Sequence, residues 1–259
     1  MSDTLSDTTP ADGPAPDTDG TPVITAHGLG VDGEHGPLFA GIDLSLGAGF
    51  HAIQMPGGHP QSALLLTLAG RLAPSAGAVS VCGDTTAPRI RRHCAIAAFG
   101  DIDELEDAVT VATVLAEQRR WLSPWYRKVG AGAGYDLLVE VSGDLTAPAL
   151  DAYIGDLTDL ELFLLRVTLA LMSDREVLIV GDLEQVRDQG QRALAVDRLA
   201  ALAARRTVVV GVTNPLGGTA ADPLGSTAAD PLGSTAADPL GSTAAAHQLH
   251  DVRASMGGL

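Results

Sequence analysis

Apolar and polar residues alternate in two segments near the start of the chain, 23–26 and 41–46. A period of two is typical of half-buried antiparallel strands, so we expect a strand in each segment. A short apolar segment at 50–54 predicts a third strand, and residues 77–83, which begin and end with glycine, predict a fourth. Between these two, the apolar run 62–70 predicts a buried helix that ends at its final glycine.

Longer elements are predicted in the second half of the chain. One helix is capped by Thr110, and a mainly apolar helix follows at 157–172. The all-apolar segment 177–180 is typical of a strand that is buried on both faces of a sheet. A polar helix at 185–204 then leads to the apolar strand 207–213, which completes a parallel βαβ unit. We therefore predict an α/β fold, with a layered parallel sheet and an antiparallel β patch near the N-terminus.

Both ends of the chain differ in composition from the middle. Residues 1–21 contain five Asp and no Lys or Arg, which predicts a disordered acidic leader because such a segment buries too little apolar area to offset its chain entropy. An octapeptide of the type PLGSTAAD occurs four times in tandem from Pro215, and each unit carries too little apolar surface for a stacked core. We predict a flexible linker at 214–246, a tail at 247–259 and one ordered domain at 22–213.

Charge and cysteine content narrow the function. The chain has 259 residues and a formal net charge of −16, so we expect no nucleic-acid partner, because such binding relies on clustered Lys and Arg. Cys82 and Cys94 are the only cysteines, and we interpret them as ordinary small apolar residues rather than a redox pair or a metal site. The N-terminus lacks the features of a signal peptide, and no apolar run is long enough to span a membrane. These features predict a cytoplasmic protein.

The stretch MPGGHPQSALL at 55–65 has the outline of a phosphate-binding loop between a strand and a helix. The loop pattern G-x-x-x-x-G-K-[ST] uses backbone N–H groups and a lysine to hold phosphates, and a hydroxyl to hold Mg²⁺. Here Met55 replaces the first glycine, Pro60 the second, and Gln61 the lysine, whereas Gly57, Gly58 and Ser62 fit. Pro60 also removes one N–H donor from the loop.

Gln61 donates a hydrogen bond but supplies no charge. Because a hydrogen bond to a charged group contributes roughly 1.5 to 3 kcal/mol, this exchange alone weakens nucleotide binding by about ten- to a hundredfold. The chain has one lysine, Lys128, which is far from the loop in sequence, and no arginine occurs between Met1 and Gly70. From the residues alone, a purely structural strand-to-helix turn and a nucleotide site are both open.

The order of the motifs resembles that of the ATP-binding cassette domain of ABC transporters, over about 23–213. The segments that carry the resemblance are LAGRL at 68–72, SAGAVSVCG at 75–83, AVTVATVL from Ala108, LTDLE at 157–161 in the place of the signature LSGGQ, DREVLIVGDL at 174–183 in the place of the Walker B strand, and TVVVGVTN at 207–214 in the place of the switch strand. The resemblance implies a P-loop NTPase-like layered sheet with a helical subdomain at about 101–165.

The resemblance also implies a site for ATP and Mg²⁺. The implied nucleotide contacts are Gly57, Gly58, His59, Gln61, Ser62 and Ala63. Ser62 and Asp182 are the implied Mg²⁺ contacts, and Asp182 is the one catalytic candidate, because it takes the place of the family's glutamate. Gly181 takes the place of the Walker B aspartate. Asp182 keeps a carboxylate that either holds water or Mg²⁺ or caps the following helix, and both interpretations stay open.

Other positions of the implied site also depart from the family pattern. Asp159 and Leu160 replace the two signature glycines that approach a partner's nucleotide, and Asn214 replaces the switch histidine. The segment 95–103 has no glutamine where the family has one, and Asp101 is the nearest polar candidate. Asp188 matches a family aspartate, but a carboxylate at the start of a helix explains it equally well.

These features predict an ATP-binding subunit of an ABC-type transporter or membrane-associated ABC complex, with weak ATP binding and poor or absent hydrolysis. The implied partners are a membrane-spanning subunit and a second cassette, in a homodimer or a heterodimer, at the inner face of the cell membrane. The alternative is a non-catalytic pseudo-ATPase that acts as a regulatory or scaffold partner. The segment 117–126 contains both tryptophans and is the candidate docking surface, although we interpret Trp121 as a core residue.

Overall fold

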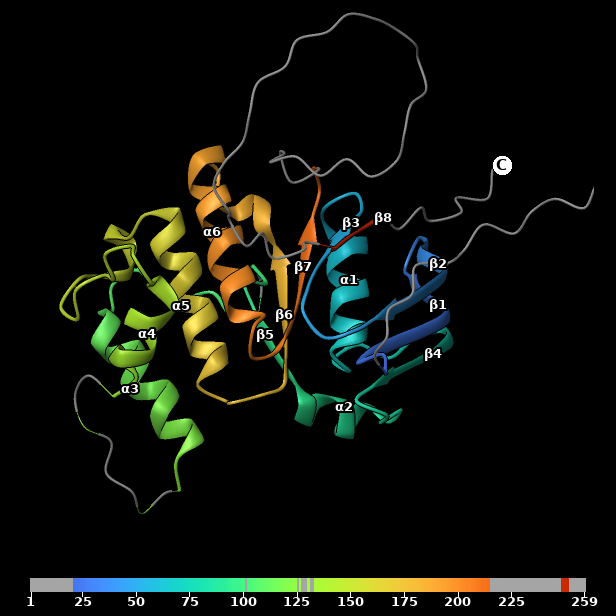
Figure 1. The fold of residues 1–259 in the computed structure, drawn as a ribbon, viewed down its shortest axis with the longest axis horizontal. Coiled ribbons are helices and arrows are strands. Elements are labelled where there is room, and N and C mark those ends of the chain that lie inside the picture. The colour runs from blue at the N-terminus through green and yellow to red at the C-terminus, as the bar shows by residue number, and fades with distance from the viewer. Residues whose placement is uncertain are drawn as a thin grey trace, which may run out of the picture.

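The computed structural model describes residues 21–100, 102–124, 126, 130, 133–214 and 248–251. A parallel sheet forms the centre of this part of the chain (Figure 1). Its strands follow the order β5-β6-β7-β3-β8, and every neighbouring pair is parallel. The strands are β3 (Phe50–Gln54), β5 (Cys94–Ala97), β6 (Val177–Asp182), β7 (Thr207–Val212) and β8 (Gln248–Asp251).

A second, antiparallel sheet has the order β2-β1-β4 and confirms the predicted N-terminal patch. Its strands are β1 (Ile24–Gly33), β2 (Gly36–Leu46) and β4 (Ala76–Val81). β1 and β2 are longer than the alternating segments from which they were predicted. Register shifts between Ala26 and Asp32 interrupt the ladder, and the period of two is lost where the strand is irregular.

Helix α1 (His59–Leu68) lies between the two sheets. It contacts β6 and β7 on one side and all three antiparallel strands on the other, so apolar residues occur on most of its faces. The helix begins three residues earlier than Ser62, the first residue of the predicted helix, because Pro60 fits the first turn, where its missing N–H has no intrahelical partner to lose.

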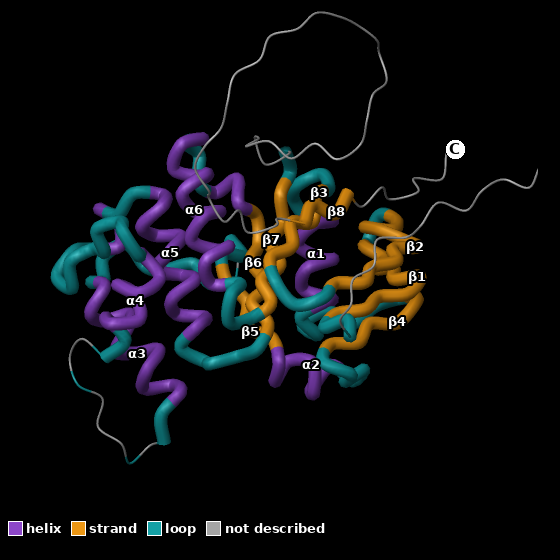
Figure 2. Tube along the Cα trace, in the orientation of Figure 1, coloured by secondary structure: helices purple, strands orange, loops and turns teal. Residues whose placement is uncertain are grey.

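The other face of the parallel sheet is covered by α5 (Asp159–Leu171) and α6 (Gln189–Leu202), which contact β5, β6 and β7. Beyond α5 lie α3 (Val111–Leu122) and α4 (Tyr135–Ser142), and these helices form a separate region on the left of Figure 2. Short α2 (Ala87–His93) leads into β5, and 3-10 turns occur at Ile154–Asp156 and Leu183–Gln185. Thr110 caps α3 as predicted, and its side chain accepts a hydrogen bond from the N–H of Thr113.

Strand β8 lies in the segment that the sequence assigned to a tail. It pairs with β3 from His51–Gln248 to Gln54–Asp251, and its residues show no pattern strong enough to predict a strand. The leader at 1–20 and the octapeptide repeats lie outside the described residues. Among the helices that the structure describes, none has the length and apolar character needed to cross a membrane.

Candidate phosphate-loop site

The candidate phosphate loop connects β3 to α1 at the carboxyl edge of the parallel sheet. Met55 N–H donates to the carbonyl oxygen of Val212 at 3.1 Å, which fixes the start of the loop beside β7. Gly58 precedes α1 with φ 93° and ψ −149°, a conformation that favours glycine. The N–H of Ser62 donates to the Gly58 carbonyl at 3.0 Å and makes the first helical hydrogen bond. Asp182 and Thr213 lie at the carboxyl ends of the neighbouring strands β6 and β7.

Gln61 lies inside the protein, although the sequence predicted it as a nucleotide contact. Its side chain is 1% exposed, and its Nε2 donates to the Met55 carbonyl at 3.3 Å. Oε1 has no hydrogen-bond partner among the described residues. Gly211 of β7 lies directly against this side chain, since a Cβ there would come within 2.8 Å of Gln61 Cδ. Gln61 therefore ties the helix to the start of the loop.

The other predicted nucleotide contacts differ in exposure. Gly57, Gly58 and His59 are exposed, Ser62 is half-buried and Ala63 is buried. Gly57 brings the loop close to the sheet edge, because a Cβ there would lie 2.6 Å from Thr213 Oγ1 and 3.6 Å from Asp182 Oδ2. The structure thus brings together the loop, Asp182 and Thr213, of which the sequence singled out the first two.

Asp182 acts as a cap in this structure. Its Oδ1 accepts a hydrogen bond from the N–H of Glu184 at 2.9 Å, at the start of the 3-10 turn. Burial raises the pKa of the Asp182 carboxyl; the hydrogen bond from the Glu184 amide lowers it, the Glu184 charge raises it and Arg192 lowers it. Of the two interpretations of Asp182, the cap is confirmed, and a contact with Mg²⁺ stays a prediction.

Gly181 occupies a position where no side chain fits. It lies in a bulge of β6, because Val180 pairs with Val210 while Asp182 pairs with Gly211. A Cβ on Gly181 would come within 2.1 Å of the Ala98 carbonyl oxygen and 2.9 Å of its carbonyl carbon. Both atoms belong to the backbone, so rotation of a side chain would not relieve this clash. The place of the Walker B carboxylate is therefore filled by the chain after β5.

Asn214 lies beside Glu184, a residue that the sequence did not single out. Asn214 Nδ2 donates to Glu184 Oε1 at 3.0 Å, and Glu184 Oε2 pairs with Arg192 of α6 at 2.7 Å. The one signal that indicates Glu184 is its place just after the carboxyl end of a buried parallel strand, the edge at which sites form in open α/β sheets. No local pattern predicts Thr213 or Arg192, because their positions depend on the packing of β7 and α6 against the sheet.

The residues in the place of the signature form the start of α5. Thr158 and Glu161 make a capping box, in which each side chain bonds to the other residue's backbone N–H. Asp159 Oδ2 accepts from the N–H of Arg187 at 3.4 Å and lies 3.8 Å from Nε of the Arg187 side chain. Leu160 is 8% exposed and packs in the core. These contacts hold α5 against the segment before α6.

The helix-start interpretation of Asp188 is confirmed, since its Oδ1 accepts from the N–H of Gln191 at the start of α6, at 2.8 Å. Asp101 lies outside the described residues. Asp103, two residues further on, takes a defined role: its carboxylate accepts from the N–H groups of Ala98 and Phe99 at 2.7 and 2.8 Å and pairs with Arg166.

Arg166 of α5 connects this turn to the chain after β6. It is 7% exposed, and its Nη1 donates to Gln185 Oε1 at 2.6 Å. Gln185 Nε2 in turn donates to the Ala98 carbonyl at 2.5 Å, the same oxygen that excludes a side chain at Gly181. A glutamine therefore reaches this region from the 3-10 turn after β6, although none occurs at 95–103.

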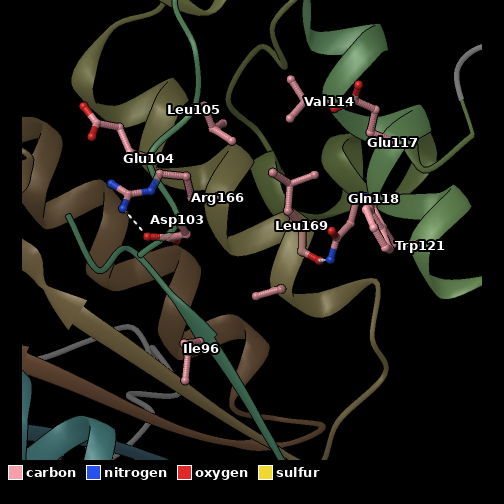
Figure 3. A pocket seen from close by; sticks show the side chains of 11 residues that line it. Ile96, Asp103, Glu104, Leu105, Val114, Glu117, Gln118, Trp121, Arg166 and Leu169 are labelled. Atoms are coloured by element: carbon pink, nitrogen blue, oxygen red, sulfur yellow. Dashed lines mark hydrogen bonds and ion pairs between the residues drawn. The ribbon is translucent and has the colours of Figure 1, made fainter. Parts of the chain in front are cut away.

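A groove with a cavity volume of about 290 Å³ lies between α3, α5 and the turn after β5 (Figure 3). Arg166 and Asp103 lie at one end, and Gln118 and Trp121 lie at the other. Trp121 is 86% exposed, so its interpretation as a core residue is wrong: it lies in the last turn of α3, on a face that no described element covers. Trp125 lies outside the described residues.

The loop fits a phosphate group only in part, and it does not fit Mg²⁺ as the family pattern would. Exposed backbone at Gly57 and Gly58 leaves N–H groups for an anion, but the residue in the place of the lysine is neutral and buried. Gly181 supplies no carboxylate and has no space for one. Asp182 alone, with Ser62, would face a cation, so no hydrolytic step follows from these residues.

Comparison with solved structures confirms the fold class. The fold is similar to that of CbiO1 from Clostridium perfringens, described as part of the ABC transporter complex CbiONQ, at 15% identity over 74% of this chain and 78% of that one, with a TM-score of 0.59. It is also similar to MJ1267, an ATP-binding cassette of an ABC transporter, at 17% identity over 74% and 81% with a TM-score of 0.60.

A third similar structure is the dimeric bacterial ABC transporter cassette MJ0796, at 16% identity over 74% of this chain and 88% of that one, with a TM-score of 0.58. No model of a known protein family matches the chain, and no curated protein matches it. The described part of the chain therefore has the fold of an ABC-transporter ATP-binding cassette.

Proposed function

We propose that this chain is the ATP-binding-cassette subunit of an ABC-type transporter or of a membrane-associated ABC complex, and that it binds nucleotide weakly and hydrolyses it poorly or not at all. The observation that carries the proposal is the lack of space for a side chain at Gly181, where an added Cβ would lie 2.1 Å from the Ala98 carbonyl oxygen. The fold supports the cassette, and this contact supports the loss of turnover.

Weak binding follows from the loop. Gly57 and Gly58 keep the backbone exposed between β3 and α1, where an anion would meet N–H groups and the positive end of the helix dipole. Gln61 supplies no charge and is held at the Met55 carbonyl. Loss of one charged hydrogen bond, roughly 1.5 to 3 kcal/mol, corresponds to about a ten- to hundredfold weaker affinity than that of a loop with lysine.

Poor turnover follows from the carboxylates. Hydrolysis in this fold would need a cation oriented at the phosphates and a polarised water. Of the two residues expected to contact Mg²⁺, Ser62 and Asp182, only Asp182 is acidic, and its Oδ1 already caps the 3-10 turn. Gly181 beside it adds no carboxylate, so the site has few groups to hold a cation and orient the attacking water.

The proposed partner is a membrane-spanning subunit that docks at the groove in Figure 3. The groove is lined by apolar residues such as Leu105 and Leu169 and by charged residues such as Glu117, with exposed Trp121 at its mouth. An exposed aromatic residue beside a groove of mixed polarity is typical of interfaces. A second cassette, identical or different, would complete the assembly at the inner face of the cell membrane. The reported dimer of MJ0796, a cassette of similar fold, supports the pairing of two cassettes.

The alternative is a pseudo-ATPase that acts as a regulatory or scaffold partner. The observation that favours it is the start of α5, where Asp159 contacts Arg187 and Leu160 is buried. A carboxylate at this position repels the phosphates of a partner's nucleotide. In this alternative the cassette contributes its surfaces to the complex and no nucleotide-dependent step.

Calorimetric titration and thermal unfolding of the full chain with Mg²⁺ and ATP distinguish the nucleotide-binding subunit from the pseudo-ATPase. A ligand at a hundred times its dissociation constant stabilises a protein by about 2.7 kcal/mol, so the first proposal predicts a rise in melting temperature at millimolar ATP. Absence of any stabilisation would leave only the scaffold alternative. Phosphate release measured in the same samples should stay at the background rate.

A double variant tests the loop itself. Gln61→Lys with Pro60→Gly should strengthen ATP binding by about ten- to a hundredfold, since it restores a cation and an N–H donor. Ala201→Lys is the matched control, because it adds the same charge at an exposed position in the last turn of α6, at the opposite edge of the sheet. Equal affinities of the two variants for ATP would show that the loop is a structural turn.

A further inference from the structure

Three side chains of different chemical type converge on the edge of the protein opposite the phosphate loop. Cys82 Sγ, a ring nitrogen of His93 and a carboxylate oxygen of Glu176 all lie within 4.8 Å of one another. Cys82 follows β4, His93 ends α2, and Glu176 directly precedes β6. The three residues thus come from three separate segments, and together they offer sulfur, nitrogen and oxygen.

The parallel sheet places His93 beside Glu176. Cys94 of β5 pairs with Val177 of β6, so the residues just before them are neighbours at the amino edge of the sheet. His93 Nδ1 lies 3.1 Å from Glu176 Oε2. The backbone at Glu176 is held in place, because its carbonyl accepts from the N–H of Thr207 at 3.0 Å. This pair is therefore fixed by the register of the core strands.

A tight turn brings Cys82 to the same place. Val81 and Asp84 exchange two backbone hydrogen bonds of 2.9 Å each across Cys82 and Gly83, which have φ angles of 50° and 82°. Positive φ at both central residues is the mark of a type I′ turn, whose first central position favours Asn, Asp or Gly. A cysteine in this left-handed conformation is unfavourable for the backbone alone, and the turn holds it beside His93 and Glu176.

Asp84, at the end of the same turn, orients the imidazole. Its Oδ2 lies 2.9 Å from His93 Nε2, and its Oδ1 pairs with Arg89 at 3.4 Å. Nε2 is thereby occupied, and Nδ1 faces Glu176. A carboxylate on one ring nitrogen with the other nitrogen turned to a metal is the usual support of a metal-binding histidine.

We propose that Cys82 Sγ, His93 Nδ1 and Glu176 bind a divalent cation of the zinc class, with Asp84 as a positioning residue and water as the fourth ligand. A mixed set of thiolate, imidazole and carboxylate suits Zn²⁺ or Co²⁺, whereas Mg²⁺ and Ca²⁺ prefer oxygen alone. The cation links the turn of the antiparallel sheet to the amino edge of the parallel sheet. The two cysteines, interpreted from the sequence as ordinary apolar residues, then differ: Cys82 is exposed, and Cys94 is buried in the core.

Titration of the untagged, metal-free full chain with Co²⁺ tests this site. One equivalent should produce a thiolate-to-cobalt charge-transfer absorption, and Zn²⁺ should displace it. Cys82→Ser should abolish the absorption, and Glu176→Gln should weaken Co²⁺ binding at least about tenfold. Asp84→Asn should weaken it by about ten- to a hundredfold, because it removes the support of the imidazole. His35→Gln, an exposed histidine in the turn between β1 and β2, is the matched control and should leave binding unchanged.

Two further measurements keep the proposal testable if Cys82→Ser fails to fold. In the wild-type chain, one equivalent of Zn²⁺ should slow alkylation of Cys82 by at least about tenfold and raise the melting temperature. Glu176 is exposed, so Glu176→Gln should fold and should need a higher Zn²⁺ concentration than the wild type to show either effect. The proposal is overturned if no charge-transfer absorption develops at one equivalent, if it persists in Cys82→Ser, or if Glu176→Gln binds as tightly as His35→Gln.

Discussion

Replacement of Gly181 by Ala tests the central steric argument of the candidate site. The added Cβ would lie 2.1 Å from the Ala98 carbonyl oxygen, where no Cβ is found in proteins, and 3.4 Å from Phe99 Cα. To relieve this contact, the ends of β5 and β6 must move apart. This movement is costly because buried core residues hold both segments in place. Overpacking of a core typically costs 1 to 3 kcal/mol, and a contact between two backbones belongs at the upper end, about 3 kcal/mol.

Urea and thermal unfolding followed by circular dichroism measure this change. For a domain of this size, about 3 kcal/mol corresponds to a melting temperature that is lower by about 6 to 12 °C. Gly47→Ala is the matched control, because a Cβ there meets open space and the backbone is outside the left-handed region; it should be neutral or stabilise by up to about 1 kcal/mol. A loss below about 1 kcal/mol for Gly181→Ala would refute the reasoning, because an aspartate would then fit in the Walker B position.

Three further predictions concern the turns around the site. Asp103→Ala should lower the free energy of unfolding by about 3 kcal/mol, since it leaves buried Arg166 without its carboxylate; a loss below about 1 kcal/mol in urea unfolding would contradict this. Asp182→Asn keeps a cap acceptor but removes the group whose pKa is raised. The stabilisation from that carboxyl is present below its ordinary pKa and is lost as pH rises through the folded pKa, so the stability of the variant relative to the wild type should increase as the pH rises above about 4; a pH-independent difference would argue against it. Thr158→Ala should lower the free energy of unfolding by about 1 kcal/mol through loss of the capping box. An equal loss in Glu161→Ala would show that both side chains of the box contribute to this stability.

The fold was largely predictable because its strongest signals are local or follow from motif order. The apolar strand at 177–180, the βαβ unit and the cap at Thr110 all follow from periodicity and capping rules, and each lies where it was predicted. Strand β8 was not predictable, since its pairing with β3 depends on a partner almost two hundred residues earlier in the chain. Trp121 was assigned wrongly because its exposure depends on which helices cover α3.

The candidate site was predictable in its location and not in its contacts. The motif order placed the loop and Asp182 near each other, and Gly57 does lie close to Asp182. That Gln61 faces inward depends on the absence of a side chain at Gly211. The lack of space for a side chain at Gly181 depends on the path of the chain after β5, where Ala98 has a φ of 59°. Both facts arise from packing between distant segments, which a local pattern does not report.

Strand β8 makes the octapeptide array an internal part of the topology. Because β7 and β8 flank β3 in one sheet, the chain leaves that sheet after Val212 and rejoins it at Gln248, with the repeats entirely between these points. A gain or loss of whole repeats during evolution would then leave every strand pairing in register. A chain that ended within the array would leave the N–H and C=O groups of one side of β3 open to pairing with other molecules. Among the described strands, β8 thus takes over from β3 as the edge of the parallel sheet.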